Sequence, residues 1–236
     1  MKIAIIGYGR MGHEVETILL ERGHEITLRA SGKSPFASSD LRDSDVAIEF
    51  SNPETAVENI MKCFDADCPV VVGTTGWYLR MPEVRLACEN KEQSLFHATN
   101  FSIGVNILFH LNKVLAGIMK DMPEYEPGLL EIHHLAKLDK PSGTAITLAE
   151  GIIENIPGKT KWVNELATTS DELTIISQRE AQVPGTHVIN YTSKVDNISL
   201  VHQANNRRGF ALGAVKAAEW LAGKKGIFTM TDMLKF

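Results

Sequence analysis

The sequence has few cysteines and no excess of positive charge. Its 236 residues include three cysteines, Cys63, Cys68 and Cys88, and none of these forms a CxxC pair. We therefore expect neither a disulfide framework nor a structural zinc site, and reduced thiols fit a cytoplasmic protein. The formal net charge is −5, so the chain lacks the broad basic surface that nucleic acid binding requires.

The sequence also lacks a long uninterrupted hydrophobic run. Its most hydrophobic stretch, 101–119, contains Asn106, His110, Asn112 and Lys113, which are costly inside a bilayer. We expect a long, mostly buried helix here that links two parts of the molecule. The start, MKIAIIGYG, is strand-length and has no cleavage-like site, so neither a signal peptide nor membrane association is expected.

Apolar runs alternate with helical periodicity in the first half of the chain. This alternation predicts βαβ units and a doubly wound, Rossmann-type parallel sheet. The interval 29–45 lacks periodicity and is too short for a further βα unit, so we expect this half to be a shortened nucleotide-binding domain. The expected strands are 2–6, 24–28, 46–50, 69–72 and 95–98, with helices at 11–21 and 53–64.

The pattern changes after residue 119. Strand-like runs follow one another with connections that are mostly too short for crossover helices, which predicts a second, mixed α/β domain. A final amphipathic helix is expected at 210–221, where alanines allow close packing. The expected strands of this part are 129–134, 173–177, 186–191 and 197–202, with a helix at 146–153.

A glycine-rich turn follows the first expected strand and opens the first helix. Gly7 permits the tight turn, Gly9 permits backbone approach to a pyrophosphate, and Gly12 permits close packing of helix on strand. The intervening residues are Tyr8, Arg10 and Met11. The segment predicts a dinucleotide site; the alternative is a tight turn that binds nothing.

Two later turns follow buried strands in the same way. The first is Gly73-Thr74-Thr75-Gly76 and the second is Ala98-Thr99-Asn100-Phe101. In a doubly wound sheet such turns lie at the carboxyl edge, where ligands bind. Small residues there leave room for a nicotinamide or its ribose, although ordinary strand-ending turns remain the alternative.

The segment 131–145, EIHHLAKLDKPSGTA, gathers two histidines and two lysines beside a helix start. His133 and His134 are adjacent and point to opposite faces of a strand. Since no third ligand stands nearby, acid–base or anion-binding work suits them better than a metal. Ser142, Gly143 and Thr144 precede a helix whose first N–H groups suit a carboxylate.

A last polar segment joins the final strand to the final helix. It reads Asn205-Asn206-Arg207-Arg208-Gly209-Phe210. Arg207 could face an anionic substrate and Phe210 could cover a cofactor. The alternative is a solvated hinge turn.

Together these motifs resemble the 4-hydroxy-tetrahydrodipicolinate (dihydrodipicolinate) reductase family from end to end. The family pattern has a GxGRMG start, an FSxP segment, a GTTG loop, an ANFS segment, an E-x-HH-xx-K-x-D-x-PSGTA signature and a closing R-x-x-F-x-x-GA helix. This chain has GYGRMG, FSNP, GTTG, ATNFS, EIHHLAKLDKPSGTA and RRGFALGA. The HH-xx-K…PSGTA signature is specific, whereas the glycine loops are not.

The resemblance implies NAD(P)H-dependent reduction of a small dicarboxylate ring in lysine and diaminopimelate biosynthesis. It implies a dinucleotide-binding domain of 1–101 and 208–236, a substrate-binding domain of 102–207 and a homotetramer. His133 and Lys137 correspond to the catalytic pair. The implied substrate contacts are His134, Ser142, Gly143, Thr144 and Arg207, and the implied cofactor contacts are Gly7 to Gly12, Gly73 to Thr75, Ala98 to Phe101, and Phe210.

The chain departs from the family pattern after its second expected strand. An acidic residue that often ends this strand is missing, and Arg29 stands there at close to the ~20-residue offset where the adenosine ribose is bound. Arg29 predicts that NADPH is accepted at least as well as NADH, unless it is merely a solvated residue. Lys140 replaces a usual alanine. A short amino-acid dehydrogenase and a non-catalytic NAD(P) sensor are the rival interpretations, and neither needs the HH-xx-K…PSGTA cluster.

Overall fold

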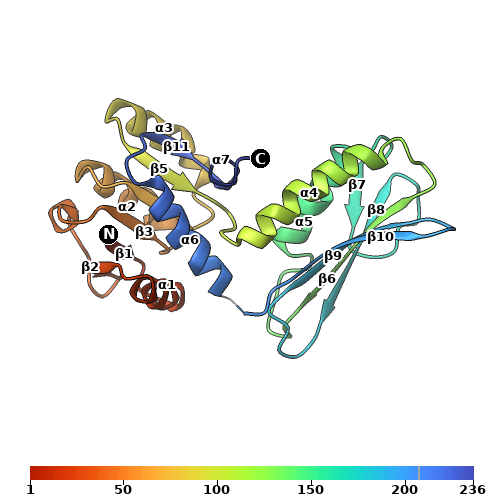
Figure 1. The fold of residues 1–236 in the computed structure, drawn as a ribbon, viewed down its shortest axis with the longest axis horizontal. Coiled ribbons are helices and arrows are strands. Elements are labelled where there is room, and N and C mark those ends of the chain that lie inside the picture. Colours follow the sequence, from red (N-terminus) through yellow and green to blue (C-terminus); the bar gives the residue numbers. More distant parts are fainter. Residues whose placement is uncertain (207) are drawn as a thin grey trace. The chain divides into compact units, whose positions relative to one another are not determined.

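The computed structural model describes residues 1–206 and 208–236. The chain forms two compact units (Figure 1). The first unit contains residues 1–103 and 208–236, and the second contains residues 104–207.

The first unit is built on a six-stranded sheet in the order β11-β5-β4-β3-β1-β2. All of its strand pairs are parallel, which confirms the predicted doubly wound sheet. Between β2 and β3 the chain forms an isolated bridge between Ser31 and Ser34 and a short 3₁₀ turn, η1 (Ser38–Leu41). This agrees with the prediction that the interval is too short for a further βα unit. The strands are β1 (Lys2–Ile6), β2 (Glu25–Ala30), β3 (Val46–Glu49), β4 (Val70–Val72), β5 (Ser94–His97) and β11 (Gly226–Phe228).

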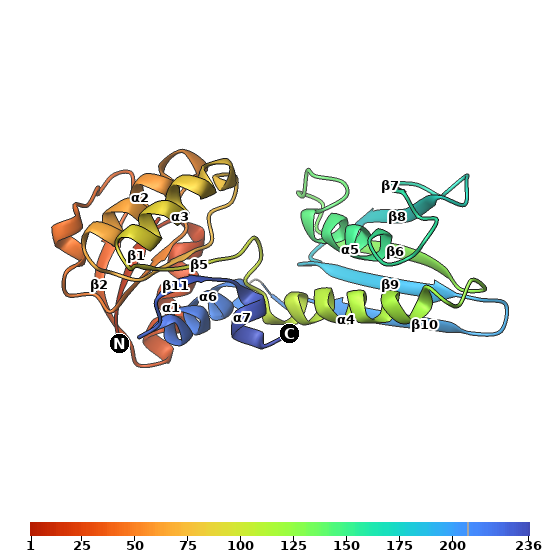
Figure 2. The same ribbon diagram turned by 90° about the horizontal axis from the view of Figure 1, so that it is seen from above.

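Helices cover both faces of this sheet (Figure 2). Alternate strand residues point to opposite faces, so Ile3 and Ile5 pack in the cluster beneath α1, α6 and α7, whereas Ala4 and Ile6 pack in the cluster beneath α2 and α3. The sequence did not predict α3, α7 or β11, whose apolar periodicity is short. The helices are α1 (Arg10–Glu21), α2 (Pro53–Asp65), α3 (Met81–Asn90), α6 (Arg208–Leu221) and α7 (Met230–Leu234), with a 3₁₀ turn η2 (Tyr78–Arg80).

The second unit is built on a mixed sheet in the order β10-β9-β6-β8-β7. Strand β9 is antiparallel to β6 and β10, whereas β8 is parallel to β6 and β7, as the short connections predicted. Helices α4 (Ile103–Met119) and α5 (Gly143–Ile153) share one hydrophobic core with this sheet. The strands are β6 (Glu126–His133), β7 (Lys161–Val163), β8 (Glu172–Arg179), β9 (Thr186–Thr192) and β10 (Asn197–Gln203).

Helix α4 is less buried than the sequence predicted. One stripe, which includes Leu108, Ala116 and Met119, is buried. A second apolar stripe lies on the surface, and the expectation of a mostly buried helix was wrong because both stripes are apolar. Across 1–206 and 208–236, no helix combines the length and hydrophobicity needed to cross a membrane. The exposed stripe consists of Ile107, Leu111, Val114 and Ile118.

Candidate active site

The glycine-rich turns of the first unit lie along one edge of its sheet. The last residues of four adjacent strands are in register, because Ile6 pairs with Glu49, Glu49 with Val72, and Val72 with His97. The residues that follow these strands are Gly7, Phe50, Gly73 and Ala98. They lie at the carboxyl edge of the sheet. After β2 the chain crosses to the other side of β1 to form β3, and doubly wound sheets bind ligands beside such a reversal of strand order.

The turn between β1 and α1 has the geometry of a dinucleotide site. Gly7 has a φ of +93°, and a Cβ there would lie 2.1 Å from the Phe50 carbonyl oxygen. A Cβ at Gly12 would lie 2.6 Å from the Gly7 oxygen, whereas a Cβ at Gly9 would meet open space. Helix α1 begins after Gly9 with no side chain capping it. The turn therefore fits a pyrophosphate, which would approach Gly9 and the first helical N–H groups.

The other residues of this turn point in different directions. Arg10 is exposed, whereas Met11 is half-buried against the core. The Tyr8 hydroxyl donates a hydrogen bond to Glu16. The backbone N–H groups of Gly7 and Tyr8 both donate to the Ala30 carbonyl at 2.9 Å, which ties the turn to the end of β2.

The Gly73 turn is tied to the end of β3. Gly73 N donates to the Glu49 carbonyl at 2.8 Å. Thr74 is buried and its hydroxyl accepts from Ser51 N at 2.8 Å, so its side chain holds the two turns together. Thr75 is exposed at the same edge.

The turn after β5 contributes both surface and core residues. Ala98 and Asn100 are half-buried and Thr99 is exposed. The Phe101 ring is buried and packs 5.8 Å from Phe96, centroid to centroid. The Phe101 side chain therefore belongs to the hydrophobic core of the first unit. Phe210 is half-buried on α6.

Arg29 forms an ion pair that the sequence did not predict. Its guanidinium donates to Glu16 Oε1 from Nε at 2.8 Å and from Nη2 at 2.6 Å. Hydrogen bonds from Tyr8 and then Arg29 lower the pKa of Glu16. The carboxylate missing from the end of β2 is thus supplied by α1, since Glu16 lies on the helix face that meets β2.

A polar patch interrupts the helix-facing side of the second sheet. The register places Leu129 beside Ile175 and Ile189, all apolar and buried. Two residues further along β6, Glu131 lies between Ser177 of β8 and His187 of β9. His133 then lies beside Arg179. The sequence missed His187 and Arg179, because only the strand register brings them to the 131–145 segment.

Glu131 is at the centre of this patch and is fully buried. Its oxygens accept from Ser142 N at 3.0 and 3.1 Å and from the Ser177 hydroxyl at 2.7 Å. Arg179 Nη1 lies 3.6 Å away. Burial alone would raise the pKa of Glu131, but the hydrogen bonds from Ser142 and Ser177 outweigh burial and lower that pKa. Glu131 is therefore an ionised, well-partnered carboxylate.

Two histidine rings lie beside Glu131, 5.0 Å apart and tilted by 72°. Burial lowers the pKa of His133, although attraction to Glu131 opposes this effect. Burial, and then the proximity of His133, lowers the pKa of His187 to about 4. The potential ligand atoms of Glu131, His133 and His187 lie within 4.8 Å of one another, a grouping that the sequence did not predict. The Arg179 guanidinium beside the same carboxylate disfavours a metal cation there.

The loop after β6 carries Lys137. Its ammonium donates to both carboxylate oxygens of Asp139 at 2.7 Å, and the hydrogen bond from Lys137 lowers the pKa of Asp139. Arg179 fixes the loop backbone by donating to the carbonyls of Lys137 at 3.3 Å and Asp139 at 2.5 Å. His134 is half-buried at the beginning of this loop.

Helix α5 begins beside this loop. Ser142 is the N-cap residue, and its buried hydroxyl accepts from Ala145 N at 3.2 Å. The Ser142 side chain therefore caps the helix, whereas Gly143 is exposed and Thr144 half-buried at its first turn. Arg207, the remaining predicted substrate contact, lies outside the described residues.

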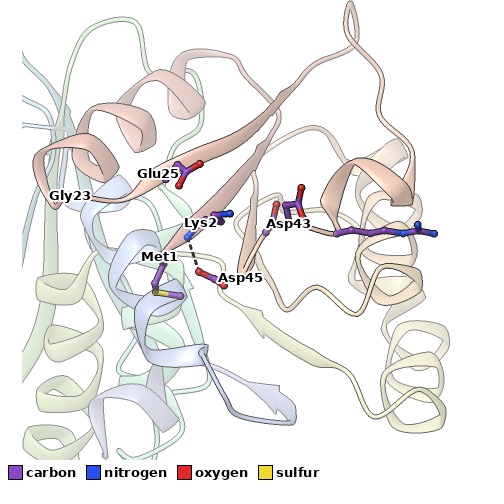
Figure 3. A pocket seen from close by; sticks show the side chains of 8 residues that line it. Met1, Lys2, Gly23, Glu25, Asp43 and Asp45 are labelled. Atoms are coloured by element: carbon purple, nitrogen blue, oxygen red, sulfur yellow. Dashed lines mark hydrogen bonds between the residues drawn. The ribbon is translucent and has the colours of Figure 1, made fainter.

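A pocket of about 590 Å³ lies at the opposite edge of the first sheet (Figure 3). It is lined by the amino ends of β1 and β2 and by the turn before β3, where Lys2 N donates to Asp45 at 2.7 Å. Because it lies at the amino ends of the strands, it is separate from the glycine-rich edge.

Comparisons with known proteins identify the family of this chain. The family model for the dihydrodipicolinate reductase N-terminus matches residues 1–101, and the model for its C-terminus matches residues 104–234. A 4-hydroxy-tetrahydrodipicolinate reductase of Christiangramia forsetii is 47% identical over 99% of this chain and 98% of its own length. One from Aquifex aeolicus is 34% identical over 90% of this chain and 79% of its own length.

Solved structures share the fold. Dihydrodipicolinate reductase from Paenisporosarcina, solved with dipicolinate bound, superposes with a TM-score of 0.80 at 22% identity and covers 99% of both chains. Amine dehydrogenase from Mycobacterium smegmatis has a TM-score of 0.61 at 11% identity over 98% of this chain and 95% of its own. On the family models and the sequence relatives, the chain belongs to the dihydrodipicolinate reductase family of oxidoreductases.

Proposed function

We propose that this chain catalyses the NAD(P)H-dependent reduction of 4-hydroxy-tetrahydrodipicolinate to tetrahydrodipicolinate, with loss of water, in lysine and diaminopimelate biosynthesis. The observation that carries this proposal is the polar cluster of the second unit, where His133 and the beginning of α5 contact Glu131, and where Arg179 donates to the carbonyl of Lys137 in the loop after β6. An amino-acid dehydrogenase or a nucleotide sensor has no need of this group.

The cofactor is held by the first unit. When bound, it supplies a hydride to the substrate ring. The Gly9 backbone and the first N–H groups of α1 would hold the pyrophosphate, and the Gly73 and Ala98 turns would lie beside the nicotinamide and its ribose. Arg29, at the end of β2, would meet the adenosine ribose of a bound dinucleotide and would favour a 2′-phosphate there, so we include NADPH as an accepted cofactor alongside NADH.

The substrate is a dianion, and the second unit supplies the groups that neutralise it. Lys137 and His134 contact one carboxylate, and the N–H groups at Gly143 and Thr144 contact the other. The Lys137 ammonium is paired with Asp139. Substrate binding therefore replaces the Asp139 carboxylate at Lys137 with a carboxylate of the substrate. The same preorganised charges favour the electron-rich transition state.

A proton must also reach the substrate. Lys137 carries an ammonium that can donate directly. His133 has a lowered pKa, so it gives up a proton readily once it has taken one. Proton delivery therefore falls to one of these two residues, and their variants separate the roles.

We also propose that the protein is a homotetramer and that it is located in the cytoplasm. Two apolar surfaces of the second unit support the assembly. Cross-strand pairing aligns Val201, Val188, Leu130 and Ile176 in one apolar row on the sheet face away from the core. The exposed stripe of α4 is a second apolar surface. A dimer needs only one self-complementary surface, whereas a tetramer of dihedral symmetry needs at least two. The sheet face and the exposed stripe of α4 would each pack against another copy of this chain.

The substrate assignment is tested with pyridine-2,6-dicarboxylate, a planar dianion that resembles the substrate. We expect calorimetry to show binding that Lys137→Ala weakens about 10-fold or more, since a charge-assisted hydrogen bond contributes roughly 1.5–3 kcal/mol. Lys140→Ala is the matched control, because Lys140 is an exposed lysine of the same loop. Equal losses in the two variants would indicate unspecific attraction and contradict the site.

A further inference from the structure

Glu131 lies at the centre of the candidate active site, yet the chemistry proposed above does not use it. We propose that Glu131 is a positioning residue that sets the tautomer and proton affinity of His133 and fixes the beginning of α5. One buried carboxylate would thus organise both the proton-handling histidine and the anion-binding helix start. This inference rests on the proposed function.

The orientation of the His133 ring supports the first part. Its Nδ1 is buried and lies 3.3 Å from Glu131 Oε2, a charge contact without hydrogen-bond geometry, and it has no hydrogen-bond partner among the described residues. Its Nε2 lies on another side, where a Cβ at Gly185 would come within 3.1 Å. An ionised carboxylate beside Nδ1 favours a proton on that nitrogen, and Nε2 is then the nitrogen that accepts and releases protons.

The contacts of Ser142 support the second part. Its N–H donates to both Glu131 oxygens, while its hydroxyl caps Ala145 N. Glu131 therefore fixes the backbone at Ser142, and with it the positions of the N–H groups of Gly143 and Thr144. Arg179 extends this arrangement, because it lies 3.6 Å from Glu131 and donates to the Lys137 and Asp139 carbonyls.

Packing alone gives little reason for an ionised carboxylate here. Moving a charge into the interior costs several kcal/mol, and an apolar side chain of similar volume is often as stable. A structural role would need only an acceptor for Ser142 N and the Ser177 hydroxyl, which the carbonyl oxygen of a glutamine supplies. The negative charge acts on His133, since it opposes the effect of burial on the pKa of that ring, and it also compensates the buried guanidinium of Arg179 at 3.6 Å.

Glu131→Gln therefore separates positioning from packing. The matched control is Glu172→Gln, because Glu172 is a buried carboxylate of the same sheet that accepts from Thr168 N at 2.8 Å and Lys161 Nζ at 3.1 Å. The Glu172 carboxylate is bound by Thr168, Thr169 and Lys161 instead of by a histidine. Both variants lose one buried charge that organises a loop.

The readouts are the pH profile of kcat/KM and the nitrogen NMR shifts of His133, assigned with His133→Gln. We expect Glu131→Gln to lower kcat on the order of 100-fold, as misplacement of a reacting group does. We also expect it to move the His133 pKa further down and to transfer the proton of the neutral ring away from Nδ1. Glu131→Asp retains the charge and should retain the wild-type tautomer. If Glu131→Gln does not fold, the tautomer of His133 in the wild-type protein remains the test, and we expect its proton on Nδ1. Glu172→Gln should leave the pH profile and tautomer unchanged.

The inference is overturned if Glu131→Gln and Glu172→Gln both lower stability and neither changes the His133 shifts or the pH profile. A wild-type His133 with its proton on Nε2 would overturn it as well. The proposed function fails separately, since it requires turnover by the wild-type protein, whereas the NMR measurement reports on Glu131 and His133 without turnover.

Discussion

The ion pair between Arg29 and Glu16 makes the cofactor preference testable. If Arg29 receives the 2′-phosphate of NADPH, its guanidinium is shared between that phosphate and Glu16, which lies 2.6 Å from Nη2. The Glu16 carboxylate also repels the phosphate. We therefore expect Arg29→Ala to weaken NADPH binding and Glu16→Gln to strengthen it, with little change for NADH in either variant.

The structure sets the expected magnitudes. A charge-assisted hydrogen bond contributes roughly 1.5–3 kcal/mol, and the lower end applies because the Arg29 side chain is 43% exposed and solvent screens the contact. This predicts an NADPH Kd about 10-fold higher for Arg29→Ala. A partly exposed ion pair contributes ~0.2–1 kcal/mol, so its release in Glu16→Gln should lower the NADPH Kd by up to about fivefold.

The assay is a fluorescence titration of each variant with NADPH and NADH at low salt. The matched control is the pair of Arg22 and Glu219, a bidentate surface ion pair of the same unit with 2.8 Å contacts at the other end of α1. Arg22→Ala and Glu219→Gln should leave both Kd values unchanged. Equal effects of Arg29→Ala on both cofactors, or weaker NADPH binding in Glu16→Gln, would refute the phosphate role of Arg29 without touching the family assignment.

Three further predictions concern the second unit. His133→Ala should lower kcat by ~100-fold or more, whereas Lys137→Ala should lower kcat and raise KM; steady-state kinetics with wild-type kcat in both would contradict the catalytic pair. Thr144→Val should weaken inhibition by pyridine-2,6-dicarboxylate by on the order of 1 kcal/mol, and an unchanged inhibition constant would remove Thr144 from the site. The pKa of His187 falls from its usual 6.5 to about 4 on folding, so only the unfolded chain binds this proton between those pH values. The free energy of unfolding should therefore fall as pH drops through this window, by about 2–3 kcal/mol near pH 4.5; urea denaturation of His187→Gln should show a shallower fall, and an equal one would contradict the assignment to His187.

The strands of the first unit were predictable because their apolar runs are short and end in glycine or polar turns. The turns at Gly7 and Gly73 could be placed at one edge, since all carboxyl ends of a parallel sheet lie together. Elements β7, β11 and α7 were missed because three to five residues carry too little periodicity. Helix α3 was missed because only Val84 and Cys88 of its ten residues are buried.

The candidate site was only partly predictable. Lys137 and His133 stand in one short segment, so the sequence alone could pair them. His187 and Arg179 come from strands far along the chain, and their positions depend on the register of β9 and β8 with β6. Glu16 was missed for a similar reason: its meeting with Arg29 depends on how α1 packs on β2, which local sequence does not specify.

The reductase activity is tested most directly by mixing the wild-type protein with NADPH and 4-hydroxy-tetrahydrodipicolinate freshly generated by the preceding synthase, and following the absorbance of the reduced nicotinamide. We predict that NADPH is oxidised in proportion to the substrate formed, that Lys140→Ala retains this activity and that Lys137→Ala largely loses it. A wild-type protein that binds NADPH but oxidises none of it when the substrate is added would contradict the proposed function.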